Sequence, residues 1–210
     1  MKKITFSILF LFLISLSNLM AISGDQEERK LSEFSDIEIS GAFTVKIIVG
    51  EEQEVIVETK DPDHLDNVIT KVKGSSLIVE MEKSWFQDFE AKIFVKVKKL
   101  ETIQSSGANS IKVRGIDTDR FKLSNNGAGS IDLEGKADYV LFSVSGAASI
   151  DAKDLKAEDV KINISGAANA SVYASESVSG DVSGVANLNY YGNPRHVDVD
   201  DSGMGSVNRR

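Results

Sequence analysis

The phrase Ser-Gly-Ala, or a close variant of it, returns every 18 to 20 residues through the second half of the chain. Its glycines are Gly107, Gly127, Gly146, Gly166, Gly184 and Gly203. A short fixed period is typical of a solenoid, in which each repeat buries its apolar side chains only against the neighbouring repeats. The spacing therefore predicts that these six glycines stack in one line.

Apolar residues alternate with polar ones on both sides of each repeat glycine, at the period of a β-strand. The inward columns are predicted six and four residues before the glycine and four and six residues after it. Their members are Phe121, Val140, Val160, Val178 and Val197; Ile103, Leu123, Phe142, Ile162 and Val199; Ile111, Ile131, Ile150, Ala170, Leu188 and Val207; and Val113, Leu133, Ala152, Val172 and Tyr190. Repeats of this length predict a parallel β-helix in which each strand pairs with its equivalent one coil away.

Each glycine is expected at a tight corner, where the chain takes a positive φ or lets the next coil approach closely. A side chain at Gly146 or Gly166 should therefore be costly. Three residues after each glycine stands a small polar residue: Ser110, Ser130, Ser149, Asn169, Asn187 and Ser206. We expect an internal ladder in which these side chains satisfy one another and the turn backbone. The alternative is a row of hydroxyls that binds a saccharide.

The sequence divides into a signal peptide over residues 1–23, a less regular β region over residues 24–100 and the solenoid repeats over residues 101–210. The middle part lacks the period, and its one Ser-Gly-Ala copy, at residues 40–42, stands isolated. We expect it to start or cap the solenoid, because a solenoid end otherwise exposes unpaired strand edges. Residues 61–65 are expected to form a turn with about one helical turn after it.

Two lysines followed by a short apolar run and Ala21-Ile22-Ser23 indicate export, to the periplasm, the outer cell surface or the medium. No second stretch is long and apolar enough for a transmembrane segment in the mature chain. The absence of cysteine excludes disulfides and thiolate chemistry. A formal charge of −8 argues against nucleic acid as a partner, since neutralising phosphates requires a basic patch.

The chain resembles the head GIN domain family, the putative auto-transporter adhesins of Bacteroidetes-type bacteria. The resemblance rests on the opening phrase Ile37-Glu38-Ile39-Ser40-Gly41, on the Ser-Gly-Ala repeats and on Ser202-Gly203-Met204-Gly205-Ser206-Val207. It implies a right-handed β-helical fold, export and a role in adhesion. No literal Gly-Ile-Asn string occurs, and the nearest is residues 115–117.

Paired carboxylates are the feature that an enzyme acting on polysaccharides would need. Asp132 and Asp151 stand at equivalent positions in neighbouring repeats, and a second group forms from Asp181, Asp198 and Asp200. Stacked carboxylates can also hold calcium, but no calcium-loop pattern is present. An exposed, solvated acidic face accounts for the same residues.

Aromatic side chains offer a second kind of binding surface. Trp85 lies in a cluster with Phe86 and Phe89 that either covers a core end or forms an interaction patch. Tyr190 falls in an inward column, which leaves Tyr191 outside.

These patterns predict an exported, non-enzymatic binding or adhesion module whose flat faces meet a glycan or protein of the cell envelope. The candidate binding residues are Asp181, Asp198, Asp200, Trp85 and Tyr191; no catalytic residue, cofactor or metal ligand is assigned. Two alternatives stay open. One is a polysaccharide lyase or hydrolase that uses the surface carboxylates, and the other is an envelope scaffold that forms homo-oligomers.

Overall fold

The computed structural model describes residues 25–82 and 89–210, and within them the chain is almost entirely β-structure. The predicted signal peptide and Trp85 lie outside the described residues. The elements are β1 (Asp25–Glu28), β2 (Asp36–Gly41), β3 (Phe43–Val49), β4 (Glu54–Thr59), the 3₁₀ helix η1 (Pro62–Asn67), β5 (Val68–Lys73), β6 (Ser76–Met81), β7 (Ala91–Val97), β8 (Thr102–Asn125), β9 (Ala128–Gly166), β10 (Asn169–Gly184), β11 (Asn187–Tyr191), β12 (His196–Asp201) and β13 (Ser206–Arg209). The expected turn and helical turn near residue 61 are therefore present.

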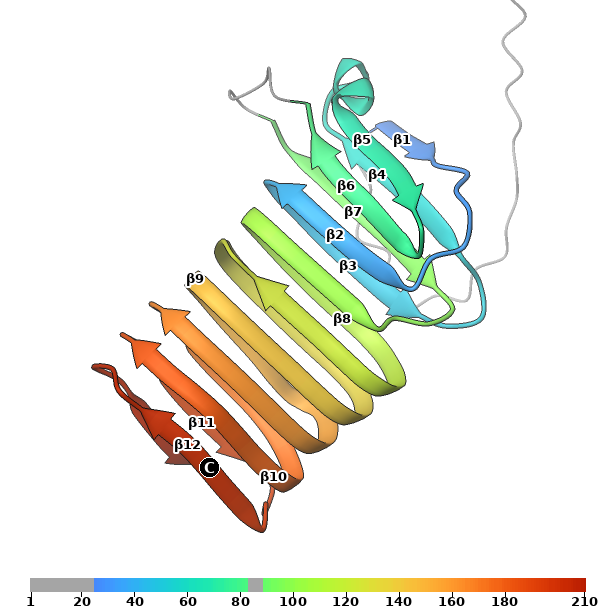
Figure 1. The fold of residues 1–210 in the computed structure, drawn as a ribbon. Coiled ribbons are helices and arrows are strands. Elements are labelled where there is room, and N and C mark those ends of the chain that lie inside the picture. Colours follow the sequence, from blue (N-terminus) through green and yellow to red (C-terminus); the bar gives the residue numbers. More distant parts are fainter. Residues whose placement is uncertain (1–24, 83–88) are drawn as a thin grey trace, which may run out of the picture.

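The strands belong to one mixed sheet that runs from β1 to β13 as a stack of flat coils (Figure 1). β9 has 39 residues. Fully extended it would reach about 130 Å at the usual rise per residue. Instead the strand turns at the glycine corners and winds from one coil of the stack into the next. β8, β9 and β10 follow one another in the sheet with parallel pairing, so the parallel arrangement predicted for the repeats is observed.

The repeat glycines form one column of close backbone contacts. A Cβ atom added to Gly127 would collide with the carbonyl oxygen of Gly107, and the same holds at every step of the column. The chain at Gly107 also has a φ of 91°, a conformation that L side chains rarely adopt. The predicted line of six glycines is observed, and Gly41 extends it by pairing with Gly107.

The Ser-Gly-Ala copy at Gly41 is therefore part of the glycine column. Its distance along the chain from the other copies had indicated that it stands isolated. β2 and β3 are paired in parallel with β8 and form a coil of the same stack. The separation was misleading because β4 to β7 intervene in the sequence, and β6 and β7 are themselves paired in parallel with β2 and β3. The division of the chain at residue 100 stays a prediction.

The amino-terminal β region also contains antiparallel strands, which the prediction of a less regular β region did not specify. β4 pairs antiparallel with β7, β5 with β6, and β1 with β4. These strands lie at the amino-terminal end of the stack (Figure 1). No helix of the described residues is long and apolar enough to cross a membrane.

The core is a single cluster inside the stack, and it confirms the four predicted columns. The last coils depart from them: Tyr190 is only half-buried, and Val197 is 47% exposed because no further coil of the described chain covers it. The structure adds columns that the period did not reveal. One stands two residues before the glycines, with Ile39, Ser105, Asn125, Val144, Ile164 and Val182, and another lies on a third side, with Ile116, Ala137, Leu155, Ala157 and Ala174.

At the amino-terminal end, Glu58 joins three strands through hydrogen bonds. Its side chain is 5% exposed and accepts from Lys92 Nζ at 2.9 Å and from Gln26 Nε2 at 3.1 Å. Burial acts to raise the pKa of Glu58, but the two hydrogen bonds and the charges of Lys92 and Lys46 outweigh it. The pKa of Glu58 therefore lies below its ordinary value of 4.5.

Three glycine substitutions separate close packing from backbone strain. Gly127→Ala creates a backbone collision without a positive φ and should lower the free energy of unfolding by about 3 kcal/mol. Gly74 has a φ of 63° and open space, so Gly74→Ala should cost about 1–2 kcal/mol. Gly50 has neither constraint, and Gly50→Ala should change stability by less than about 0.5 kcal/mol. Urea denaturation measures all three, and equal effects would contradict the contact column.

Glu58→Gln should destabilise the protein by about 1–2 kcal/mol at neutral pH, because a charged acceptor is lost from two hydrogen bonds. A group with a lowered pKa contributes stability above its unfolded pKa and loses that contribution as the pH falls through its folded pKa. The difference between wild type and variant should therefore shrink between about pH 7 and about pH 3. Denaturation curves across this range test the prediction. Glu33→Gln, in an exposed ion pair with Lys98, is the control and should have no measurable effect; a pH-independent Glu58→Gln effect would refute the assignment.

Candidate binding surfaces

The polar row that follows the glycines lies on the outside of the stack. Ser110, Ser130, Ser149, Asn169 and Asn187 are exposed and Ser206 is half-buried. Side chains one coil apart are hydrogen-bonded: Ser110 to Ser130 at 3.3 Å, Asn187 to Asn169 at 3.0 Å, and Ser206 to Asn187 at 2.9 Å. The predicted ladder is thus partly correct, since its members satisfy one another but are not internal. Their remaining donors and acceptors face solvent.

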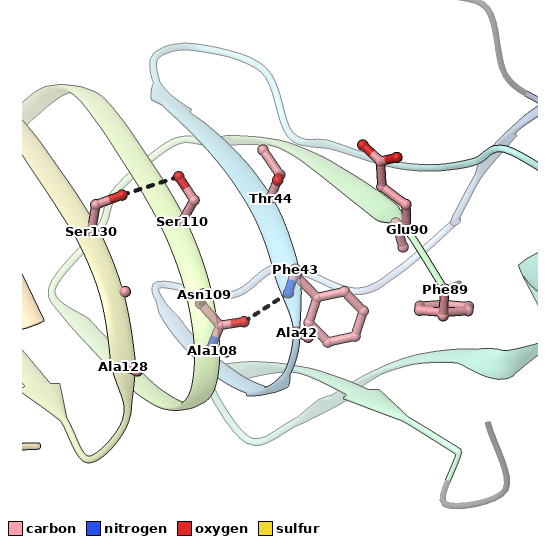
Figure 2. Close-up of a pocket in the computed structure, with 12 residues that line it drawn as sticks. Ala42, Phe43, Thr44, Phe89, Glu90, Ala108, Asn109, Ser110, Ala128 and Ser130 are labelled. Atoms are coloured by element: carbon pink, nitrogen blue, oxygen red, sulfur yellow. Dashed lines mark hydrogen bonds between the residues drawn. The ribbon is translucent and has the colours of Figure 1, made fainter. Parts of the chain in front are cut away.

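A shallow groove of about 390 Å³ lies at the amino-terminal end of this row (Figure 2). Ser130, Ser110 and Thr44 from β3 follow one another along the groove, and Glu90 and Phe89 lie beyond Thr44. Ala108 and Ala128 supply a floor of methyl groups. The groove therefore combines an apolar floor with a hydroxyl-bearing rim.

Asn109 fixes the corner beneath this groove. Its Oδ1 accepts from the backbone N–H of Phe43 at 3.0 Å, and its Nδ2 donates to Ser105 Oγ at 3.1 Å and to the Ser106 carbonyl at 2.8 Å. The side chain is buried and fully used, so it holds two coils together and offers nothing to a ligand. The sequence analysis missed this role. The available signal was an asparagine in a column otherwise filled by Gly129, Ala148 and Ala168.

The first pair of candidate carboxylates is matched with lysines. Asp132 and Asp151 line one small groove of about 130 Å³ together with Lys112 and Lys153. Lys112 Nζ lies 3.7 Å from Asp132, and Lys153 Nζ bonds to Asp151, which raises the pKa of Lys153. The structure thus brings the two carboxylates to one place, where each would have to break an ion pair before acting on a sugar.

The second group of carboxylates lies on the last two coils. Asp181 on β10 pairs in register with Asp200 on β12, while Asp198 pairs with Ser179. All three are exposed. Across residues 25–82 and 89–210 no three acidic or histidine side chains are grouped closely enough to hold a metal ion. The arrangement is a solvated acidic face in which Asp181 and Asp200 repel each other.

The candidate binding residues that the structure describes belong to two different strand pairs. Tyr191 on β11 is half-buried and pairs in register with Tyr173, whereas the acidic residues belong to the β10 and β12 pair. The Tyr173 ring in turn receives the Lys156 ammonium, 4.0 Å from its centroid. Sequence reasoning did not find Tyr173 or Lys156, because neither belongs to a column counted from the glycines.

These observations define a class of protein: an all-β stack of coils that carries rows of polar side chains on its outside. The family described as "Putative auto-transporter adhesin, head GIN domain" matches residues 33–194. The chain belongs to this family, as its repeat phrases had indicated. No match was found among proteins of curated function.

A solved structure shares this fold, and others align with lower scores. A putative adhesin from Bacteroides fragilis NCTC 9343 aligns with a TM-score of 0.72 at 20% identity, over 89% of this chain and 96% of that chain. A putative lipid binding protein from Parabacteroides distasonis ATCC 8503 aligns with a TM-score of 0.48 at 20% identity, over 90% and 97%. A putative adhesin from Parabacteroides merdae ATCC 43184 gives 0.48 at 15% identity, over 89% and 95%. At these identities the first similarity establishes the fold alone.

Removing one carboxylate of the acidic face tests the calcium hypothesis. Asp200→Asn should stabilise the protein slightly, by about 0.2–1 kcal/mol, because repulsion with Asp181 is relieved. Neither millimolar calcium nor a chelator should change the melting temperature of wild type or variant. A calcium-dependent rise in the melting temperature that Asp200→Asn abolishes would instead show a metal site.

Proposed function

We propose that this protein is an exported binding or adhesion module that holds an extended partner along its stacked coils and carries out no chemistry. Its repeats would wind as a right-handed parallel β-helix. Right-handed winding is expected because about 98% of connections between parallel strands of one sheet have that hand.

The observation that carries this proposal is the external row from Ser110 to Ser206. Its members repeat once per coil, at about the 4.8 Å strand spacing, and retain free hydrogen-bonding capacity. A row of small polar side chains at a fixed interval suits a long, repetitive ligand better than a small one. The groove at the Ser110 and Ser130 end adds an apolar floor where part of such a ligand can be dehydrated.

The adhesin descriptions of the family and of two of the aligned structures support a binding role over an enzymatic one. The lysine partners of Asp132 and Asp151 agree with this assignment, because a hydrolase or lyase would need carboxylates that are free to reach the substrate. The partner is a glycan or a protein of the cell envelope. The predicted leader would deliver the chain to the periplasm, the outer surface or the medium.

Two arginine substitutions in the row test the proposal. Ser130→Arg and Asn169→Arg place long charged side chains over the row and should weaken binding of the mature chain to envelope fractions by more than tenfold. Gln104→Arg puts the same side chain at an exposed position outside the row and should bind as wild type does. Pull-down and surface plasmon resonance measure the effect, with circular dichroism as a check on folding. Equal binding by all three variants, or no binding by wild type, would refute the role of the row.

A further inference from the structure

A second groove, of about 350 Å³, runs along the stack on the third side of the coils. It is lined by one short segment from each of four successive turns: residues 117–119, 136–138, 156–158 and 173–175. In each of the first three segments the outer two side chains are exposed and the central one is partly or fully buried. Every turn therefore adds one side chain to each wall and one to the floor, with the walls about 7 Å apart at the usual rise.

One wall presents hydrogen-bond donors at fixed positions. Lys136 Nζ lies 3.2 Å from Asp117, and the Lys156 ammonium lies over the Tyr173 ring while donating to the Lys153 carbonyl at 2.9 Å. The two contacts of Lys156 restrain its ammonium group, whereas the Lys136 and Asp117 pair is exposed, and both ammonium groups keep further N–H groups for a ligand. Donors fixed in advance lose less conformational entropy on binding than free lysine side chains would.

The opposite wall presents acceptors. Asp119, Asp138 and Glu158 line it, and none of their carboxylates makes a hydrogen bond or an ion pair with another described residue. All three are exposed, so they are solvated in the free protein. Their lone pairs are therefore available to hydroxyl donors at each turn of the stack.

The floor between the walls is small and apolar. Ala137 and Ala157 are buried at 5% and 4% exposure, and Thr118 continues their line. Because these side chains belong to the core and alternate with the exposed wall residues, only the strand backbone lies between the two walls. A sugar ring can lie over this backbone while the walls bind its hydroxyl groups.

We propose that this groove binds a neutral, linear glycan that lies along the axis of the stack; the inference rests on the binding role proposed above and names its ligand class. Sugar hydroxyls donate and accept at once, so they satisfy both walls. A polyanion would meet the three free carboxylates, and a polycation would meet the Lys136 and Lys156 ammonium groups. The groove is lined by four carboxylates and two ammonium groups, so charge selects most strongly against polyanions, and the chain's overall charge of −8 adds to that rejection.

Titration of the mature chain with neutral oligosaccharides of glucose, mannose and N-acetylglucosamine tests the proposal, with polygalacturonate and chitosan as charged comparisons. At least one neutral series should bind, with affinity rising with length up to the span of the groove. Asp138→Ala and Glu158→Ala should each weaken that binding by more than tenfold without changing the melting temperature. Glu134→Gln, at an exposed carboxylate outside the groove, is the matched control and should bind normally.

The double variant Asp138→Asn and Glu158→Gln separates acceptor capacity from charge. It keeps an oxygen acceptor at each position, so neutral glycans should still bind, and polygalacturonate should bind more tightly than it binds wild type. Failure of every neutral series to bind, or tighter binding of either charged polymer by wild type, would overturn the inference. If Ser130→Arg abolishes binding to envelope fractions while Asp138→Ala and Glu158→Ala do not affect glycan binding, the groove is wrong and the proposed function stands.

Discussion

The structure depends on one close contact between backbones, repeated along the column of glycines. Where the carbonyl oxygen of Gly107 lies against Gly127, there is no room for a side chain. The contact brings successive coils to strand spacing at a corner, so the straight segments on either side can form parallel hydrogen bonds. The glycine contact also sets the register between the strands of neighbouring coils. A shift of one residue would exchange every inward side chain for an outward one.

The core of the repeat region is shared between neighbouring coils. Each coil buries its apolar columns only against the coils above and below it, and stability is shared between neighbours. The amino-terminal end differs, because β4, β5 and β1 add antiparallel strands there and Glu58 joins β1, β4 and β7 by hydrogen bonds. The amino-terminal end of the stack therefore contains antiparallel strand pairs, whereas the strands in its middle are paired in parallel.

The sequence allowed the columns around the glycines to be predicted, because a side-chain period of two and a fixed glycine spacing together define direction and register. It did not reveal that Gly41 pairs with Gly107, since the intervening strands conceal the relation. The third side was also missed. Register shifts between Val113 and Ile116 and between Val172 and Tyr173 change the residue count there, so a column counted from the glycine loses its alignment.

The register shifts on the third side determine how the length of a coil can vary. Spacings of 18, 19 and 20 residues all fit the same glycine column because the third side takes up the difference. The glycine corner has no room for such a difference, because its backbones are already in close contact. The third side also carries the groove of Lys156 and Glu158, so a change in coil length would alter the groove and leave the glycine column in place.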